Sequence, residues 1–349
     1  GVWIMAYTAI NKSSNFFNVK LWTGNGNTGL AITGLNFKPD LTWIKERNQS
    51  RGHVLFDVVR GATYQFNPNS NATNVAVAES LKTFDTDGFT VGNATSVNEN
   101  NYLYVSWNWL ASNSSSSNTA GSINSTVSVN TTSGCSIVSY SANNTAGATV
   151  GHGLGVIPKM ILVKESTGSV NDWVVYNASV GNTKKTILNE TNAEGIDNFM
   201  NDTTPTSTVF SISDASVVNR TGSTYMAYCF AEVQGFSKFG TYKANENTDG
   251  TFTYCGFKPA FVLIKQSNLA RDWYMYDNKR NTFNVINKEI NANNSGAEDT
   301  GDAIDFLSNG FKIRTTGASL NDAGGTYLYM CFAENPFVTG DSATPTTAR

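Results

Sequence analysis

The chain has 349 residues, of which 40% are hydrophobic and only 15% are charged, and its formal net charge is −3 at pH 7. It contains neither a run of Lys and Arg nor an apolar stretch of about 20 residues, so we expect neither nucleic-acid binding nor a membrane-spanning helix. Typical soluble domains carry about 25% charged residues, so the low fraction here predicts a neutral surface that suits protein packing or contact with sugars.

The main signal along the chain is a segment that occurs three times, in which a Pro opens an apolar run and a Lys follows six positions later. The copies span residues 39–45, 158–164 and 259–265. A polar turn containing Asn25, Asn143 or Asn245 precedes each copy. Further apolar runs follow in the same order, at 54–57, 173–176 and 273–277, at 88–91, 209–212 and 310–313, and at 102–107, 225–230 and 327–332. Such regular spacing predicts three homologous units.

The apolar runs have the character of β-strands. They are short, rich in Val, Ile, Tyr, Phe and Trp, and bounded by Gly, Asn, Asp and Pro. A unit of about 100 residues with many short strands is typical of a β-sandwich. We therefore predict an all-β chain of three tandem, jelly-roll-like β-sandwich units, with an N-terminal arm and first unit at 1–111, a second unit at 135–234 and a third at 235–338.

Two segments outside these units are polar. Residues 112–134 are rich in Ser, Asn and Thr, and their few apolar side chains cannot offset the ordering entropy of about 1–2 kcal/mol per residue. They predict a mobile linker that lets the first unit move against a fused second and third unit. Residues 339–349 predict a C-terminal tail.

Several motifs resemble a domain family of tailed bacteriophages, found in tail-fibre-like or virion-associated proteins of marine phages. They are Gly-Leu-Asn-Phe-Lys-Pro-Asp-Leu-Thr-Trp-Ile-Lys at 34–45, Phe-Asp-Thr-Asp-Gly-Phe-Thr-Val-Gly at 84–92, Gly-His-Gly-Leu-Gly-Val-Ile-Pro at 151–158 and Cys-Phe-Ala-Glu-Asn-Pro-Phe at 331–337. The resemblance covers nearly the whole chain and is poorest at 183–208. It implies a concanavalin-like or SPRY-like sandwich on the virion exterior, and it implies no catalytic residues.

Three motifs invite a chemical interpretation, and each also has a structural one. Asp85 and Asp87 could begin a calcium loop, but an Asp-Gly hairpin turn explains them without metal. His53 lies near Asp57 and Arg60 in the sequence, but no Ser or Cys nucleophile motif accompanies the pair, so we expect a surface or hydrogen-bonded histidine. His152 lies in a glycine-rich run that lacks the spacing of a phosphate loop and predicts a turn.

The remaining candidates are acidic, thiol, ammonium and aromatic side chains. A solvated acidic loop is preferred over paired glycosidase carboxylates for Glu298, Asp299, Asp302 and Asp305. Cys229 and Cys331 share a repeat position, aligned with Ser106, which predicts a small buried side chain. The recurring lysines, Lys45, Lys164 and Lys265, predict an ion pair or a cap on backbone carbonyls, with a ligand pocket as the alternative. Three tryptophans, Trp22, Trp107 and Trp109, are either sugar-stacking or core residues.

Together these patterns predict a non-enzymatic structural protein on the exterior of a tailed phage, made in the host cytoplasm, either as a tail fibre or as a head decoration. No catalytic, cofactor-binding or metal-ligating residue is predicted, and no cofactor. The expected partners are further copies in a homotrimer, other virion proteins and a host-surface glycan. The alternative function is a lectin-like receptor-binding module, and polysaccharide depolymerase activity comes third.

Overall fold

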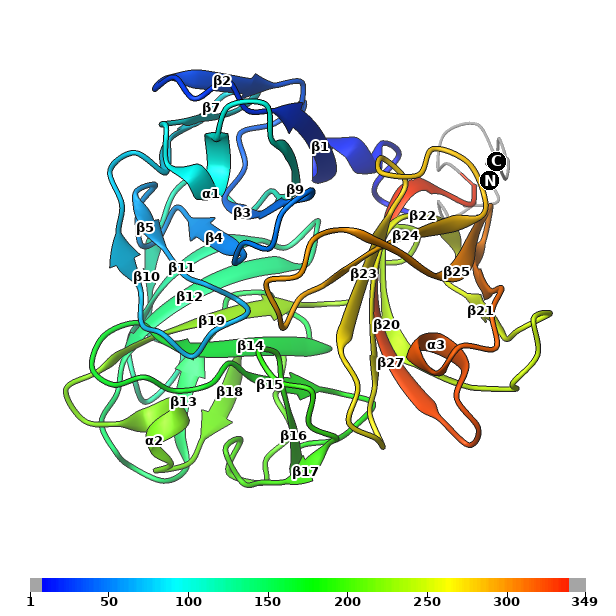
Figure 1. Cartoon of the computed structure of the whole chain (residues 1–349). Coiled ribbons are helices and arrows are strands. Elements are labelled where there is room, and N and C mark those ends of the chain that lie inside the picture. Colours follow the sequence, from blue (N-terminus) through cyan, green and yellow to red (C-terminus); the bar gives the residue numbers. More distant parts are fainter. Residues whose placement is uncertain (1–7, 339–349) are drawn as a thin grey trace, which may run out of the picture.

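The computed structural model describes residues 8–338, which form an all-β protein of three lobes around a common centre (Figure 1). The predicted all-β class is confirmed. The predicted tail, and the first seven residues of the predicted N-terminal arm, lie outside the described residues.

The first unit is a two-sheet sandwich. One sheet has the order β1-β9-β3-β4 and the other has the order β2-β8-β7. The first sheet consists of β1 (Phe17–Thr23), β9 (Leu103–Trp109), β3 (Leu41–Glu46) and β4 (Val54–Asp57), and the second of β2 (Leu30–Thr33), β8 (Gly88–Val91) and β7 (Leu81–Asp85). The unit also contains η1 (Ser13–Asn15), the short pair β5 (Tyr64–Gln65) and β6 (Val75–Ala76), and α1 (Thr95–Asn98).

The second unit repeats this strand order and extends it. Its large sheet has the order β10-β11-β12-β19-β14-β15-β16-β17, and a second sheet pairs β13 with β18. The strands are β10 (Ser116–Asn118), β11 (Ser125–Asn130), β12 (Cys135–Ser141), β19 (Thr224–Phe230), β14 (Met160–Glu165), β15 (Val174–Asn177), β16 (Lys184–Ile187), β17 (Gly195–Ile196), β13 (Ala148–Gly151) and β18 (Val209–Ile212), with α2 at Ser216–Asn219.

In the third unit the same order runs through one continuous sheet, β20-β27-β22-β23-β24-β25-β26-β21. The elements are β20 (Ser237–Lys243), β27 (Thr326–Pro336), β22 (Phe257–Gln266), β23 (Trp273–Asp277), β24 (Ile286–Asn291), β25 (Asp299–Leu307), β26 (Gly310–Ile313), β21 (Phe252–Tyr254) and α3 (Ala318–Asn321). Residues 299–305 therefore belong to a strand, and the predicted solvated acidic loop is wrong for them.

The recurring polar turns have a common anchor. The side chain of Asn98, at the end of α1, accepts the backbone N–H of Asn25 (2.8 Å), and Asn321 accepts that of Asn245 in the same way (2.8 Å). Asn219 does so for Asn143 (2.9 Å). Each anchoring amide is buried, and its Nδ2 also donates to backbone carbonyls. One buried Asn per unit thus fixes the turn that precedes the repeated Pro.

The three units share one central core. Trp109, Phe230 and Phe332 occupy the same position of β9, β19 and β27, and their ring centroids are 6.0, 5.7 and 5.9 Å apart in the three pairs. All three rings are buried. The repeated Pro-to-Lys strands are also buried along their whole length, because each lies between this centre and its own sandwich core. The prediction that the first unit moves against the other two is therefore wrong.

Residues 112–134 are likewise not a free linker. They form β10 and β11, and β11 pairs with β12 along six residues, from Ser125 with Tyr140 to Asn130 with Cys135. Asp40 of the first unit anchors the start of the segment, because its carboxylate accepts the N–H groups of Ala111 (2.7 Å) and Asn113 (2.9 Å). Strand pairing supplies the ordering energy that the few apolar side chains alone cannot.

Limited proteolysis should therefore leave the segment between Ser112 and Thr132 uncut in the native protein. Replacing Asp40 by Ala removes both anchoring acceptors, and we expect this variant to be cleaved first in that segment. Burial raises the pKa of Asp40 to about 6 despite these hydrogen bonds, so the cleavage should be compared at pH 7.5, where the wild-type carboxylate is ionised. Early cleavage of the wild type at 112–132 would contradict the pinned strand.

Candidate functional site at the junctions between the units

The three units contact one another in a closed ring. In the three units, the chain beyond β4, β15 and β23 reaches the next unit and forms a backbone hydrogen bond there. Asn74 N–H donates to Ser166 O (3.4 Å), Glu194 N–H to Ser267 O (2.6 Å) and Glu298 N–H to Arg47 O (2.6 Å). The first unit thus contacts the second, the second the third, and the third the first. The chemistry-bearing residues singled out in the sequence lie mainly at these junctions.

The repeated lysines cap backbone carbonyls, one of the two functions predicted for them. Lys164 Nζ donates to Asn71 O of the first unit (2.8 Å), and Lys265 Nζ donates to Thr191 O of the second (3.1 Å). Lys45 Nζ donates to Glu46 O (2.5 Å) and Gln49 O (3.4 Å) within its own unit. Burial lowers the pKa of each ammonium to about 8, so all three remain charged at neutral pH.

His53 occupies the junction position that a tryptophan holds in the other two units. Trp173 Nε1 donates to Asn67 O (3.2 Å), Trp273 Nε1 donates to Ile187 O (2.8 Å), and His53 Nε2 lies 3.1 Å from Asn291 O. Trp43 Nε1 donates to His53 Nδ1 (2.8 Å). Since an indole N–H can only donate, the proton of the neutral imidazole is on Nε2 and is given to the Asn291 carbonyl. The ring nitrogens thus bond Trp43 and Asn291, not Asp57. Of the two states predicted for His53, the hydrogen-bonded one is confirmed and the surface one is wrong, because the side chain is buried.

Burial, reinforced by the Lys45 charge, lowers the pKa of His53 well below 6.5. Below pH 6.5 the unfolded chain therefore binds a proton at His53 that the folded chain does not bind. The free energy of unfolding should fall as the pH drops below 6.5, with a slope of up to about 1.4 kcal/mol per pH unit for this group. The double variant Trp43→Leu/His53→Trp recreates the Leu162 and Trp173 arrangement of the second unit. Its unfolding free energy between pH 7 and 5 should lack this share of the slope.

Burial also lowers the pKa of His152 and raises that of Asp40 to about 6, and both residues are unchanged in the double variant. Their contributions to the slope are therefore the same in both proteins. An unaltered slope in the double variant would show that His53 is not the proton-linked group.

Two junctions contain a buried Asp–Arg pair. Asp57 Oδ2 accepts Arg60 Nε (2.5 Å) and the hydroxyl of Tyr228 from the second unit (2.7 Å). Asp277 Oδ2 accepts Arg280 Nε (2.6 Å) and Trp107 Nε1 from the first unit (3.1 Å). At the third junction the corresponding residues are Asn177, Val180 and Met330. Met330 has no proton to donate, and the Asp–Arg pair is missing at the same junction.

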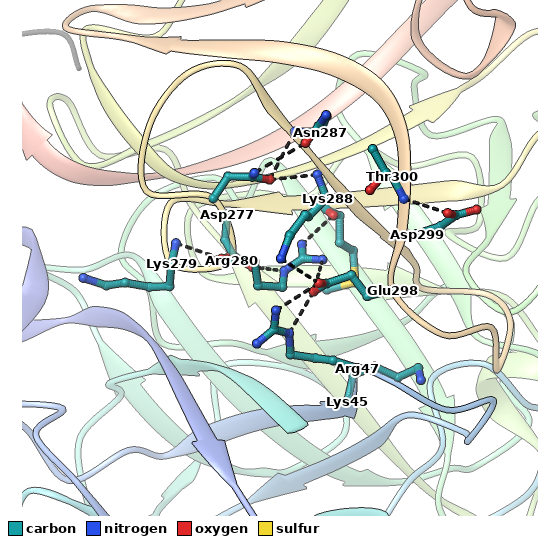
Figure 2. Close-up of polar contacts among 12 residues, drawn as sticks. Lys45, Arg47, Asp277, Lys279, Arg280, Asn287, Lys288, Glu298, Asp299 and Thr300 are labelled. Carbon is teal, nitrogen blue, oxygen red and sulfur yellow. Dashed lines mark hydrogen bonds and ion pairs between the residues drawn. The ribbon is translucent and has the colours of Figure 1, made fainter. Parts of the chain in front are cut away.

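Glu298 is the centre of an ionic cluster between the third and first units, where Arg47, Arg280 and Lys288 converge on it (Figure 2). Arg47 binds it with two nitrogens, at 2.8 and 2.9 Å, and Arg280 Nη1 lies 3.6 Å away. Burial alone would raise the pKa of Glu298, but the hydrogen bonds from Arg47 and the nearby charges hold it below 4.5. A carboxylate held ionised between cations is suited to joining units.

The other carboxylates singled out in the sequence are also used in structural contacts. Asp87 accepts the N–H groups of Gly34 (3.0 Å) and Asn36 (2.7 Å), and Asp85 faces Gly88 in the β7–β8 hairpin, as the predicted turn requires. Asp302 accepts the Thr315 hydroxyl (2.7 Å), and Asp305 lies 3.3 Å from Arg314. Within residues 8–338, no group of three His, Cys, Asp or Glu side chains could hold a metal ion.

The remaining sequence candidates are core residues. His152 bonds the backbone at both ring nitrogens, to Leu154 N–H (3.2 Å) and Thr206 O (3.2 Å). Cys229 and Cys331 are free and buried as predicted, but their strand register aligns them with Asn108 and not with Ser106. Trp107 and Trp109 are buried, and Trp22 stacks on Tyr104 at 5.3 Å. Trp107 and Trp109 are therefore core residues, and Trp22 is a partly buried residue packed against the core of the first unit.

Sequence reasoning missed Arg47, Arg280 and Tyr228, and it singled out Trp107 without its hydrogen bond across the junction. One signal was available. The pattern Asp-x-x-Arg occurs at 57–60 and 277–280 but not at 177–180. The partners that distinguish the junctions lie on other units, roughly 170 positions away in the chain, and single-sequence spacing does not link them.

These observations define the class of protein: an all-β, β-sandwich protein whose three lobes are locked into a ring by buried polar contacts. The chain belongs to the family described as "Domain of unknown function (DUF7483)", whose model matches residues 12–336. No curated protein and no solved structure matches it. No helix among residues 8–338 has the length and apolar character needed to cross a membrane.

Proposed function

We propose that the protein is a non-enzymatic structural component on the exterior of a tailed phage particle, either in a tail fibre or appendage or as a head decoration. The closed ring of junctions is the observation that carries this proposal. Buried hydrogen bonds and ion pairs connect every unit to the next, and the aromatic triad fills the centre. Such a body resists deformation, which an exposed particle component requires.

The way the reactive side chains are used supports the non-enzymatic part of the proposal. Both ring nitrogens of His53 and His152 take part in hydrogen bonds inside the fold. All four thiols are buried, and burial raises the pKa of Cys135, Cys229 and Cys331. Thiols with raised pKa values are poor nucleophiles at neutral pH. These groups stabilise the fold.

The location on a particle rests on the sequence resemblance to tail-fibre-like and virion-associated proteins. Immunogold labelling of purified particles of the encoding phage, imaged by negative-stain electron microscopy, tests it directly. We expect gold at defined external positions on intact particles, and protein of the full-chain mass in the purified particles. Absence of the chain from mature particles would refute the proposal.

We further propose that the protein acts as a homotrimer, since viral appendages are commonly closed cyclic assemblies. Multi-angle light scattering at micromolar concentration should give about three times the chain mass of 37.7 kDa. A mass near 37.7 kDa would instead identify the three-lobed single chain as the assembling unit.

A further inference from the structure

A groove of 580 Å³ lies where the third unit meets the first. Five consecutive residues of β1, Phe17 to Leu21, line one side of it. The other walls come from Gly34 and Asn36 of the first unit and from Ala260, Asn278, Lys279 and residues 333–335 of the third. A groove that follows a strand for five residues has the shape of a site for an extended polypeptide.

The strand beside this groove is a sheet edge, since β1 is the first strand in the order β1-β9-β3-β4. Leu110 N–H donates to Phe16 O and Gly24 N–H donates to Tyr102 O, so the even-numbered residues direct their backbone groups to β9. Antiparallel alternation then directs those of Phe17, Val19 and Leu21 away from β9. Val19 N–H is bonded by the Asn18 side chain (3.0 Å), a local contact that an incoming carbonyl could replace.

The second unit shows what occupies the same edge. β12 corresponds to β1, and its outer edge pairs with β11, whose sequence is Ser-Thr-Val-Ser-Val-Asn. Among the residues that the structure describes, no strand pairs with the outer edge of β1. β11 thus gives the length and the pattern, small polar residues alternating with Val, of a segment that suits this edge.

The surroundings of β11 correspond to the walls of the groove. Asn278 N–H donates to Ala260 O as Val58 N–H donates to Asp40 O, so Ala260 and Asn278 hold the places of Asp40 and Val58. Asp40 lies 3.4 Å from the Ser128 hydroxyl of β11.

The opposite wall corresponds as well. Gly153, in the second unit, lies against β11, and a Cβ there would be 3.2 Å from Val129 Cγ1. Gly34, at a similar place in the first unit and also with positive φ, lines the groove. The groove is therefore the counterpart of the β11 site.

Asn278 departs from the repeat in a way that points to a ligand. Its counterparts in the other units are Val58 and Ala178, whereas Asn278 is 4% exposed and its Oδ1 has no hydrogen-bond partner within residues 8–338. A buried amide without a partner costs about 1–3 kcal/mol, and two apolar counterparts show that the position does not need one. An N–H group of a bound strand would satisfy this oxygen.

The charge of the groove indicates the sign of the occupant. Lys20 and Lys279 line it, and within residues 8–338 neither ammonium takes part in an ion pair. One carboxylate, Glu334, also lines the groove, but it is paired with Lys258 at 3.2 Å. A segment with acidic residues at its ends would therefore be favoured over a neutral or basic one.

We infer that the groove between the first and third units binds an extended, acidic-flanked segment of a different protein, which adds to β1 as an antiparallel or parallel strand. Main-chain hydrogen bonds to Phe17, Val19 and Leu21 hold the segment, Asn278 accepts one of its N–H groups, and Lys20 and Lys279 attract its acidic ends. This inference goes beyond the proposed function and does not depend on it.

The test uses the full chain and fluorescent octapeptides that carry the β11 sequence between two Asp residues. A second set has this sequence shifted by one residue, so that the opposite side chains face the protein. Versions flanked by Lys in place of Asp serve as controls for charge. Fluorescence anisotropy at low salt should show saturable binding of at least one Asp-flanked peptide, and weaker binding of its Lys-flanked version. Hydrogen exchange at residues 17–21 should slow when the peptide binds. Failure of every Asp-flanked peptide to bind at 1 mM would overturn the inference.

Two variants separate the groove from nonspecific binding. Leu21→Pro removes an outward-facing N–H and leaves the pairing with β9 intact, and Thr241→Pro is the matched control at the same position of the edge strand β20. Asn278→Val introduces the residue of the first unit and should not destabilise the fold. We expect tenfold or greater weakening with Leu21→Pro, a clear loss with Asn278→Val, and no change with Thr241→Pro.

Three further outcomes would contradict the inference. Equal binding by wild type and both groove variants would place the peptide elsewhere. Self-association that is lost with Leu21→Pro would identify a second copy as the occupant. If the Leu21 amide of the free chain is protected, and deletion of residues 1–7 or 339–349 removes this protection, the chain fills its own groove.

Discussion

Replacing Asp277 by Asn is expected to lower the free energy of unfolding by up to about 3–5 kcal/mol, because it removes the nearer counter-charge of the buried Arg280 guanidinium and leaves it only Glu298, at 3.6 Å. Asp277 and Arg280 have fully buried side chains, and Asp277 also accepts Trp107 Nε1 across the junction. Urea unfolding at pH 7 measures the change. Glu232→Gln, in the partly exposed pair with Lys238, is the control and should cost less than about 1 kcal/mol.

The double variant Asp277→Asn/Arg280→Val copies Asn177 and Val180 of the second unit, where the chain manages without the pair. It removes the buried guanidinium that lost its nearer counter-charge, so it should recover at least half of the stability lost in the single variant. A double variant as unstable as Asp277→Asn alone would show that the lost contact with Trp107, and not the stranded guanidinium, causes the effect.

Replacing Trp109 by Ala is expected to cost about 3–5 kcal/mol, the usual range for removing a buried aromatic side chain. Trp109 contacts Phe230 and Phe332 of the other two units, so the loss should lower the stability of the whole ring. Differential scanning calorimetry should show one transition for the wild type, shifted to lower temperature in the variant.

Trp109→Phe is the matched control, because phenylalanine occupies this position in both other units. The indole N–H of Trp109 has no hydrogen-bond partner among the described residues, so the change removes no hydrogen bond seen there and should alter stability by only about 1 kcal/mol. Two separate transitions in the wild type, with only one of them sensitive to Trp109→Ala, would instead indicate units that unfold independently.

Several features could be predicted from the sequence because they depend on local patterns. Short apolar runs bounded by Gly, Asn and Pro predicted the all-β class, and the Asp85–Gly88 hairpin follows from turn chemistry. The carbonyl-capping function of Lys45, Lys164 and Lys265 is one of three interpretations that the sequence allows, beside an ion pair and a ligand pocket, since a lysine at the end of a buried strand must find oxygen partners nearby. The composition of residues 112–134 predicted a mobile linker, which is wrong, because composition carries no information on the strand edge with which these residues pair.

The arrangement that unites the units was decided only in the tertiary structure. Ring closure requires Trp109 to meet Phe230 and Phe332, and Asp277 to meet Trp107, over separations of more than a hundred residues. Secondary-structure propensity depends on residues close together in the chain, so it does not predict contacts at such separations. The sequence by itself determined the strands and their threefold recurrence, because strand period and turn chemistry are local. The ring and the groove beside β1 arise only where strands from different units share one desolvated core.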